Sequence, residues 1–166
     1  MTALVIVKPI TITDAMLTSS NVTEADYSAW SSATTYALGA RVILVSTHKI
    51  YESLQASNLN KDPLTQPLWW VEVSPTNRWA CLDTSVTTQT KKATSIVYTL
   101  APGEVVNALA ALNLTNATSI VISMTSVLGG GSVFSKTISL AALQKSESMM
   151  MSDHTLADLD NDGKKE

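Results

Sequence analysis

Residues 27–70 read YSAWSSATTYALGARVILVSTHKIYESLQASNLNKDPLTQPLWW, and this stretch decides how the chain is interpreted. It holds three of the four Trp and three of the four Tyr residues, so the large aromatic side chains concentrate here. Short apolar runs alternate with turn residues, and a polar segment at 58–63 precedes the closing Trp pair. This pattern predicts a small β-unit of about three short strands held together by aromatic side chains.

The order and spacing of these residues resemble the small chitin-binding type of carbohydrate-binding module that is attached to bacterial chitinases and cellulases. The residues that carry the resemblance are Trp30, Tyr36, Gly39, Val42, Tyr51, Asn58, Pro63 and Trp70. The resemblance implies a three-stranded module over residues 27–74, inserted into the rest of the chain.

The aromatic residues have two interpretations, which the sequence leaves open. A unit this small needs large side chains to form a core, and that role is assigned to Trp30, Tyr36 and Tyr51, together with one of Trp69 and Trp70. The related sugar-binding modules usually carry adjacent exposed aromatics where this chain has Ser-Leu-Gln-Ala at 53–56. Stacking on a sugar would therefore fall to other residues, and the candidates are Trp69, Trp70 and Trp79.

Composition predicts an all-β protein and narrows its partners. Ser, Thr and β-branched residues are frequent and 15% of residues are charged, which suits strands better than helices. A formal charge of −3 without a basic cluster argues against nucleic acid as a partner. No apolar run reaches the roughly 18 residues of a membrane span, and the first ten residues lack the features of a signal peptide. The single Cys81 is expected to be a small buried residue.

The segments on either side of the module are expected to pair as strands. Before it, residues 3–7 and 10–13 read as strands and residues 15–17 as a short helical turn. After it, strands are expected at 79–83, 95–100, 117–124 and 133–140, with Gly residues 129–131 at the tip of the last hairpin. Residues 105–114 fit either a helix or a strand, and their surroundings favour a strand.

This order of segments resembles structural proteins of phage tails, and the resemblance also rests on VKPITITDAMLTSSNV (7–22) and PTNRWACLD (75–83). It implies that residues 1–26 and 75–140 form one jelly-roll-like β-sandwich with residues 27–74 nested in it. It also implies a non-enzymatic structural component of the virion. Its partners would be other copies of itself, other virion proteins and host-surface polysaccharide. The alternative is a free carbohydrate-binding protein or a detached binding module of a polysaccharide hydrolase.

Few residues suit catalysis. His48 lies in an expected turn and His154 in the acidic tail, and no nucleophile, zinc or phosphate-loop motif occurs in the sequence. Two acid pairs could in principle flank a glycosidic bond, although exposed loop carboxylates are far commoner. These pairs are Glu24 with Asp26 and Asp62 with Glu72. We therefore expect no enzymatic activity and no cofactor.

Residues 141–166 are expected to form a tail that either docks on another chain or remains flexible. Its first part, 141–151, fits a helix ending in three Met residues, and the acidic remainder is expected to be disordered. Asp158, Asp160 and Asp162 match the first half of an EF-hand calcium loop, which makes calcium a candidate ligand. The bidentate carboxylate of that loop would fall at position twelve, past Glu166. A solvated acidic tail is therefore the preferred interpretation.

Overall fold

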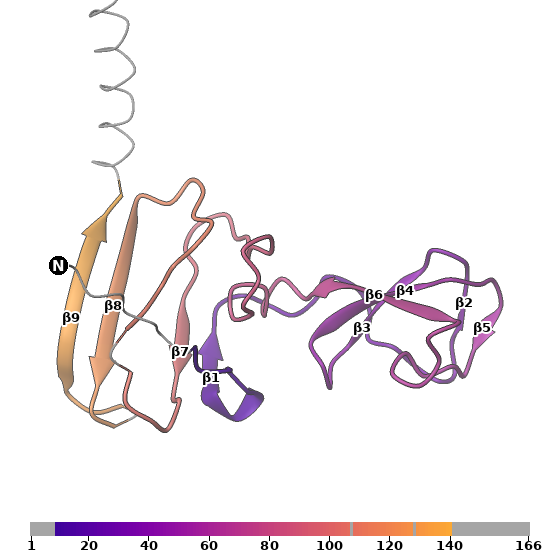
Figure 1. Cartoon of the computed structure of the whole chain (residues 1–166), viewed down its shortest axis with the longest axis horizontal. Coiled ribbons are helices and arrows are strands. Elements are labelled where there is room, and N and C mark those ends of the chain that lie inside the picture. The colour runs from indigo at the N-terminus through magenta and orange to yellow at the C-terminus, as the bar shows by residue number, and fades with distance from the viewer. Residues whose placement is uncertain (1–8, 107, 128, 141–166) are drawn as a thin grey trace, which may run out of the picture. The chain divides into compact units, whose positions relative to one another are not determined.

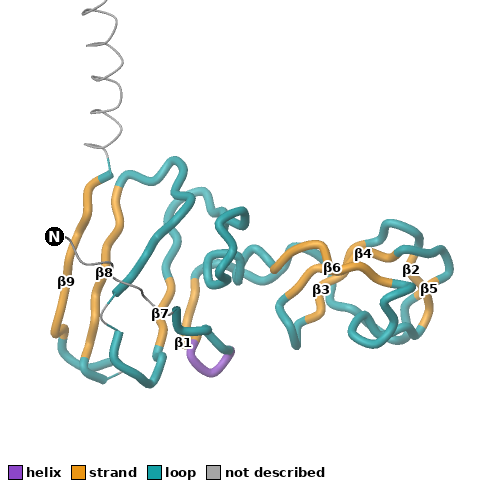
Figure 2. Tube along the Cα trace, in the orientation of Figure 1, coloured by secondary structure: helices purple, strands orange, loops and turns teal. Residues whose placement is uncertain are grey.

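The computed structural model describes residues 9–140 apart from 107 and 128, and nearly all its regular elements are β-strands (Figures 1 and 2). The exception is a single 3-10 turn, η1 (Asp14–Met16), at the place where the sequence predicted a helical turn. The strands form four small antiparallel sheets, which confirms the predicted all-β class. The jelly-roll-like sandwich stays a prediction. The chain divides into two compact units, and the boundary lies between residues 113 and 114. Each unit is described separately.

The first unit contains three of the sheets. β1 pairs with β7, which joins the segment before the module to the segment after it. Inside the module, which we define as residues 27–74, β2 pairs with β5, and β3, β4 and β6 form a three-stranded sheet. The bounds are β1 (Leu17–Ser20), β2 (Thr35–Tyr36), β3 (Arg41–Leu44), β4 (Lys49–Ser53), β5 (Asn58–Leu59), β6 (Trp70–Pro75) and β7 (Tyr98–Leu100).

The core of the module is aromatic, as predicted. Val42, Tyr51 and Trp70 are buried on one face of the three-stranded sheet, and Trp30, Tyr36, Leu44 and Trp69 pack against them. The Tyr36 and Trp70 rings meet edge to face, with centroids 5.2 Å apart. The polar atoms of both side chains also have hydrogen-bond partners, because Trp70 Nε1 donates to Lys61 O and Ser31 N donates to Tyr36 Oη. The core roles of Trp30, Tyr36 and Tyr51 are therefore confirmed.

Two residues of the chitin-binding pattern have a clear backbone or polar role. Gly39 has a φ of 78° in the turn before β3, a conformation that residues with a Cβ rarely adopt. Asn58 is completely buried, and its side-chain amide donates to Ser53 Oγ and to Trp69 O. Asn58 thereby fixes the long loop before β6 onto the end of β4.

The second unit contains one hairpin among its described residues. β8 (Ser119–Thr125) pairs with β9 (Ser132–Ser139), close to the predicted strands 117–124 and 133–140. Gly129 lies in the connection with a φ of 75°, so the predicted hairpin is confirmed.

The expected strand at 79–83 and the expected burial of Cys81 are wrong. The amides of Trp79 and Ala80 both donate to Thr76 O, and Leu82 N donates to Trp79 O, so this segment forms a turn. Trp79 and Ala80 are both buried although they are neighbours in sequence, whereas Cys81 is exposed. A strand would place neighbours on opposite faces.

Two other expected strands are absent from the described part of the chain. Residues 10–13 lead into η1 without pairing, and residues 105–114, apart from 107, are neither strand nor helix. Most apolar side chains of the second segment are exposed, with Val105 89% exposed, whereas Ile10 and Ile12 of the first segment are partly buried. The predicted strand at 95–100 is shorter, since pairing begins at Tyr98. The expected strand at 3–7 lies outside the described residues.

Replacing the central indole tests the module core. Trp70→Ala should lower the free energy of unfolding of the module by about 3–5 kcal/mol, because it removes a buried ring and leaves a cavity. Trp69→Ala should cost less than half as much, because Trp69 is only partly buried. Urea unfolding followed by circular dichroism measures both values, and equal costs would contradict this description of the core.

Candidate functional site

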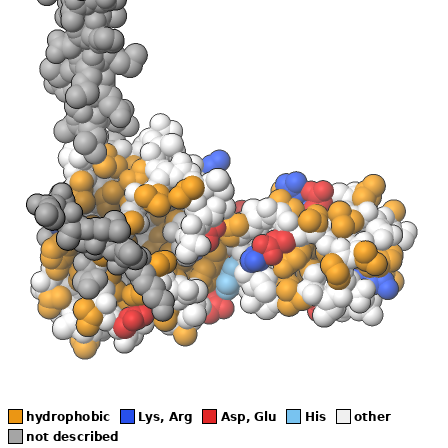
Figure 3. All heavy atoms as spheres, viewed as in Figure 1, with side chains coloured by type: hydrophobic (Ala, Val, Ile, Leu, Met, Phe, Trp, Pro, Cys, Tyr) orange, Lys and Arg blue, Asp and Glu red, His pale blue; other side chains and the backbone are white. Residues whose placement is uncertain are grey.

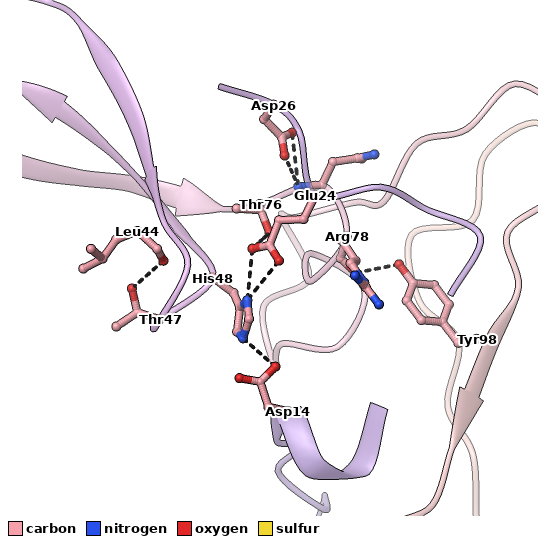
Figure 4. A network of polar contacts seen from close by, with 10 residues as sticks. Asp14, Glu24, Asp26, Leu44, Thr47, His48, Thr76, Arg78 and Tyr98 are labelled. Atoms are coloured by element: carbon pink, nitrogen blue, oxygen red, sulfur yellow. Dashed lines mark hydrogen bonds and ion pairs between the residues drawn. The ribbon is translucent and has the colours of Figure 1, made fainter. Parts of the chain in front are cut away.

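A group of polar and aromatic side chains gathers where the chain leads into and out of the module (Figure 4). We call Asp14, Glu24, His48, Thr76 and Trp79 the neck cluster. Asp14 comes from η1 and His48 from the turn between β3 and β4, whereas Glu24 precedes the module and Thr76 follows β6. These residues are far apart in sequence, so folding alone brings them together.

His48 lies at the centre of the neck cluster. Its Nδ1 is 3.0 Å from Glu24 Oε1, and its Nε2 is 2.9 Å from Asp14 Oδ1, an ion-pair contact rather than an aligned hydrogen bond. The Trp79 ring stacks on the imidazole with centroids 4.1 Å apart. The ring is therefore held on both edges and on one face.

Thr76 fastens the other side of the cluster. It is fully buried, and its hydroxyl donates to Glu24 Oε1 at 3.0 Å while its amide donates to His48 O at 2.8 Å. Glu24 thus accepts a hydrogen bond from the segment after the module while it also contacts His48 inside the module. Next to it, Asp26 accepts the amide of Asn77, which closes the neck with a second link.

The backbone at His48 carries strain that these contacts must offset. Its φ is 56°, in the left-handed region that residues with a Cβ rarely adopt, at a cost of about 1 kcal/mol. Both ring nitrogens of His48 face carboxylates, Nδ1 facing Glu24 and Nε2 facing Asp14. His48 therefore links η1, the segment before the module and the segment after it, and we call this set of contacts the clasp.

Each carboxylate of the proposed acid pairs is engaged in the fold. Glu24 and Asp26 make the neck contacts, Asp62 Oδ1 accepts the amide of Leu64 at 2.8 Å, and Glu72 pairs with Lys49 at 2.7 Å. None of these contacts places two carboxyl groups across an open cleft.

An open groove lies beside the neck, with Asp26, Asn77 and Lys91 among its lining residues. Its polar groups bond to one another, since Asn77 Nδ2 donates to Lys91 O and Lys91 N donates to Asn77 Oδ1. These bonds stabilise the loop after the module. They also leave few polar groups of the groove available to hydrogen-bond a ligand.

Tyr98 of β7 anchors the turn that follows the module. Its hydroxyl donates to Arg78 O at 2.6 Å, and burial raises the pKa of the phenol to about 12.

On the module sheet, the Tyr27 hydroxyl and the Glu52 carboxylate raise the pKa of Arg41. Arg41–Glu52 and Lys49–Glu72 are exposed cross-strand ion pairs, and Figure 3 shows charges of both signs side by side on the module.

Only one of the three candidate sugar-stacking residues keeps accessible ring surface. Trp70 is 3% exposed within the core and Trp79 is 9% exposed against His48, so neither can present a face to a sugar in this structure. Trp69 is partly buried, and the Lys61 ammonium lies over its ring at 5.1 Å from the centroid. We call Trp69 and Lys61 the Trp69 face.

The remaining candidates lie elsewhere. His154 and the calcium candidates Asp158, Asp160 and Asp162 lie outside the described residues. In the described ranges, no group of three or more His, Cys, Asp or Glu side chains is arranged to hold a metal ion. No helix in this part of the chain is both long and apolar enough to cross a membrane.

The sequence pointed to Glu24 and His48 separately, as an acid pair member and a turn residue, but not to their contact. Asp14, Thr76 and Lys61 were missed as site residues. Comparison with models of known protein families, with curated proteins and with solved structures finds no match.

The neck cluster can be tested through its energetics. His48→Asn keeps a residue that tolerates positive φ but removes the ring, so it should lower the free energy of unfolding by about 1–3 kcal/mol. Glu24→Gln should do the same, and the double variant should cost clearly less than the sum, because the two side chains contact each other. Urea unfolding of the four proteins measures the coupling, and strictly additive costs would contradict the clasp.

Tyr98 predicts how stability depends on pH in the alkaline range. The phenol has a raised pKa in the folded chain, so its contribution to stability is complete below about pH 10 and is lost as pH rises through 12. Absorbance at 295 nm should show a phenol that ionises near pH 12, and Tyr98→Phe should remove it. A Tyr98→Phe protein with an unchanged titration would contradict the assignment.

Proposed function

We propose that this chain is a non-enzymatic structural component of a phage virion whose module contacts host-surface polysaccharide. The observation that carries the proposal is that the polar side chains of the candidate sites make structural contacts, whereas one candidate aromatic side chain does not lie in the buried core. The His48 imidazole and the carboxylates of both acid pairs are engaged in structural contacts, while Trp69 alone among the three candidate stacking residues is only partly buried. This suits binding and presentation rather than turnover.

The attachment of the module supports a role in presentation. Both segments that connect it to the rest of the unit meet at the neck, where Glu24 contacts Thr76 and Asp26 contacts Asn77. A module fixed at two adjacent points moves less than one on a single flexible linker. A binding face carried on it therefore keeps a defined direction.

The second unit supports a role in assembly. β8 and β9 form a sheet of only two strands, and two-stranded sheets are marginally stable in water unless another strand or layer covers them. Ile120 and Ile138 face each other across the pair, as do Met124 and Phe134, and Ile122 faces Lys136 between them, so this side is apolar except for one Lys. Neighbouring copies or other virion proteins are the proposed source of that cover.

Assembly and glycan binding can be tested on the whole chain. Light scattering after size-exclusion chromatography should show a defined oligomer, and Ile122→Lys on β8 should shift it toward smaller species. Val86→Lys is the matched control, because Val86 is 62% exposed in a loop. In parallel, chitin oligomers and bacterial polysaccharides should change the Trp fluorescence of the protein but not of Trp69→Ala.

These measurements separate the proposal from its alternative. A protein that stays monomeric at high concentration but binds sugar would be a free carbohydrate-binding protein or a detached module. A monomer that binds no sugar would contradict both accounts.

A further inference from the structure

We propose that the Trp69 face binds an anionic polysaccharide, with Lys61 pairing with its carboxylate or phosphate groups. This inference rests on the proposed function and specifies the chemical class of its ligand. It starts from the position of the Lys61 ammonium over the Trp69 ring.

Hydrogen bonds to the core of the module fix the backbones of Lys61 and Trp69. Trp69 O accepts bonds from Leu54 N and from the amide of the buried Asn58, so the Trp69 backbone is fixed on the core. The neighbouring Trp70 ring donates through Nε1 to Lys61 O at 2.7 Å. The backbone positions of Lys61 and Trp69 are therefore set by one small network, and only the Lys61 stem is free to move.

Lys61 differs from the other basic residues of the module. Arg41 pairs with Glu52 and Lys49 pairs with Glu72, whereas Lys61 makes no ion pair among the described residues. The adjacent Asp62 turns toward its own loop, where its Oδ1 accepts the amide of Leu64. Lys61 is thus a cation whose charge is met by an aromatic ring and not by a carboxylate.

This arrangement treats neutral and anionic sugars differently. A neutral pyranose that stacks on Trp69 has to displace the ammonium and forfeits the cation–π contact. A sugar that carries a carboxylate or phosphate can instead draw the ammonium to its own charge while its ring contacts the indole. The face therefore favours anionic chains, such as uronic acid polymers or glycerol phosphate polymers.

The test compares three probes on the whole protein by titration calorimetry: trigalacturonate, poly(glycerol phosphate) and the neutral chitotriose. At low salt, at least one anionic probe should bind about fivefold more tightly than chitotriose, and added salt should remove the difference. Lys61→Gln should abolish the preference, since it removes the charge without touching the core. Lys49→Gln makes the same charge change at an ion pair of the sheet and should leave the preference intact. The anionic probe that binds identifies the source of the charge.

The outcomes distinguish this inference from the proposed function. If all three probes bind equally, or if Lys61→Gln leaves the preference unchanged, the anionic specificity is overturned while sugar binding by Trp69 stands. If none of the probes binds, and a wider set of polysaccharides does not change the Trp fluorescence, the glycan-contact function itself fails. Trp69→Ala should remove binding of every probe, and its folding is checked by circular dichroism.

Discussion

The contact of Glu24 with both His48 and Thr76 is the interaction that joins the separate segments of the first unit. One carboxylate joins the segment before the module, the turn inside it and the segment after it. Partly buried carboxylates are costly unless they are hydrogen-bonded, so each partner of Glu24 compensates for its burial. Because these partners come from three different parts of the chain, the carboxylate fixes where the module begins and ends.

The size of the module explains why its aromatic residues form a core before they serve any other role. With Val42, Tyr51 and Trp70 as its buried cluster, the module has little apolar surface to exclude from water. Large rings supply most of that area, and the edge-to-face contact of Tyr36 with Trp70 adds to it. A binding face can then use only rings that the core does not enclose. Among the three candidate stacking residues this leaves Trp69, beside the long loop whose attachment depends on Asn58.

Short sequence patterns correctly predicted the strands and turns that depend mainly on neighbouring residues. The strands around Val42, Tyr51 and Val71 and the β8–β9 hairpin were predictable, because alternation and turn residues specify short antiparallel pairs. The turn after Thr76 was not, because its two consecutive buried residues, Trp79 and Ala80, are covered by packing that the sequence does not reveal. The apolar run at 105–114 was likewise predicted as a strand although no partner strand pairs with it in the described chain.

The candidate site was less predictable than the fold. The aromatic candidates could be found from composition, but choosing Trp69 over Trp70 required knowing which ring faces the sheet. The neck cluster joins residues as distant as Asp14 and Trp79, and no spacing rule brings such residues together. His48 also adopts a backbone conformation that its residue type does not favour, so only the folded contacts indicate it.

The closeness of the two connecting segments at the neck also bears on how such a chain can change over generations. Residues 26 and 77 are hydrogen-bonded neighbours, so recombination at these two points would exchange everything between them without altering the distance that the flanking chain must span. A receiving chain would need only a suitable pair of acceptor and donor groups at its own junction. The whole module could then be exchanged as one segment, while the parts of the gene that encode β1, β7 and the hairpin stay unchanged.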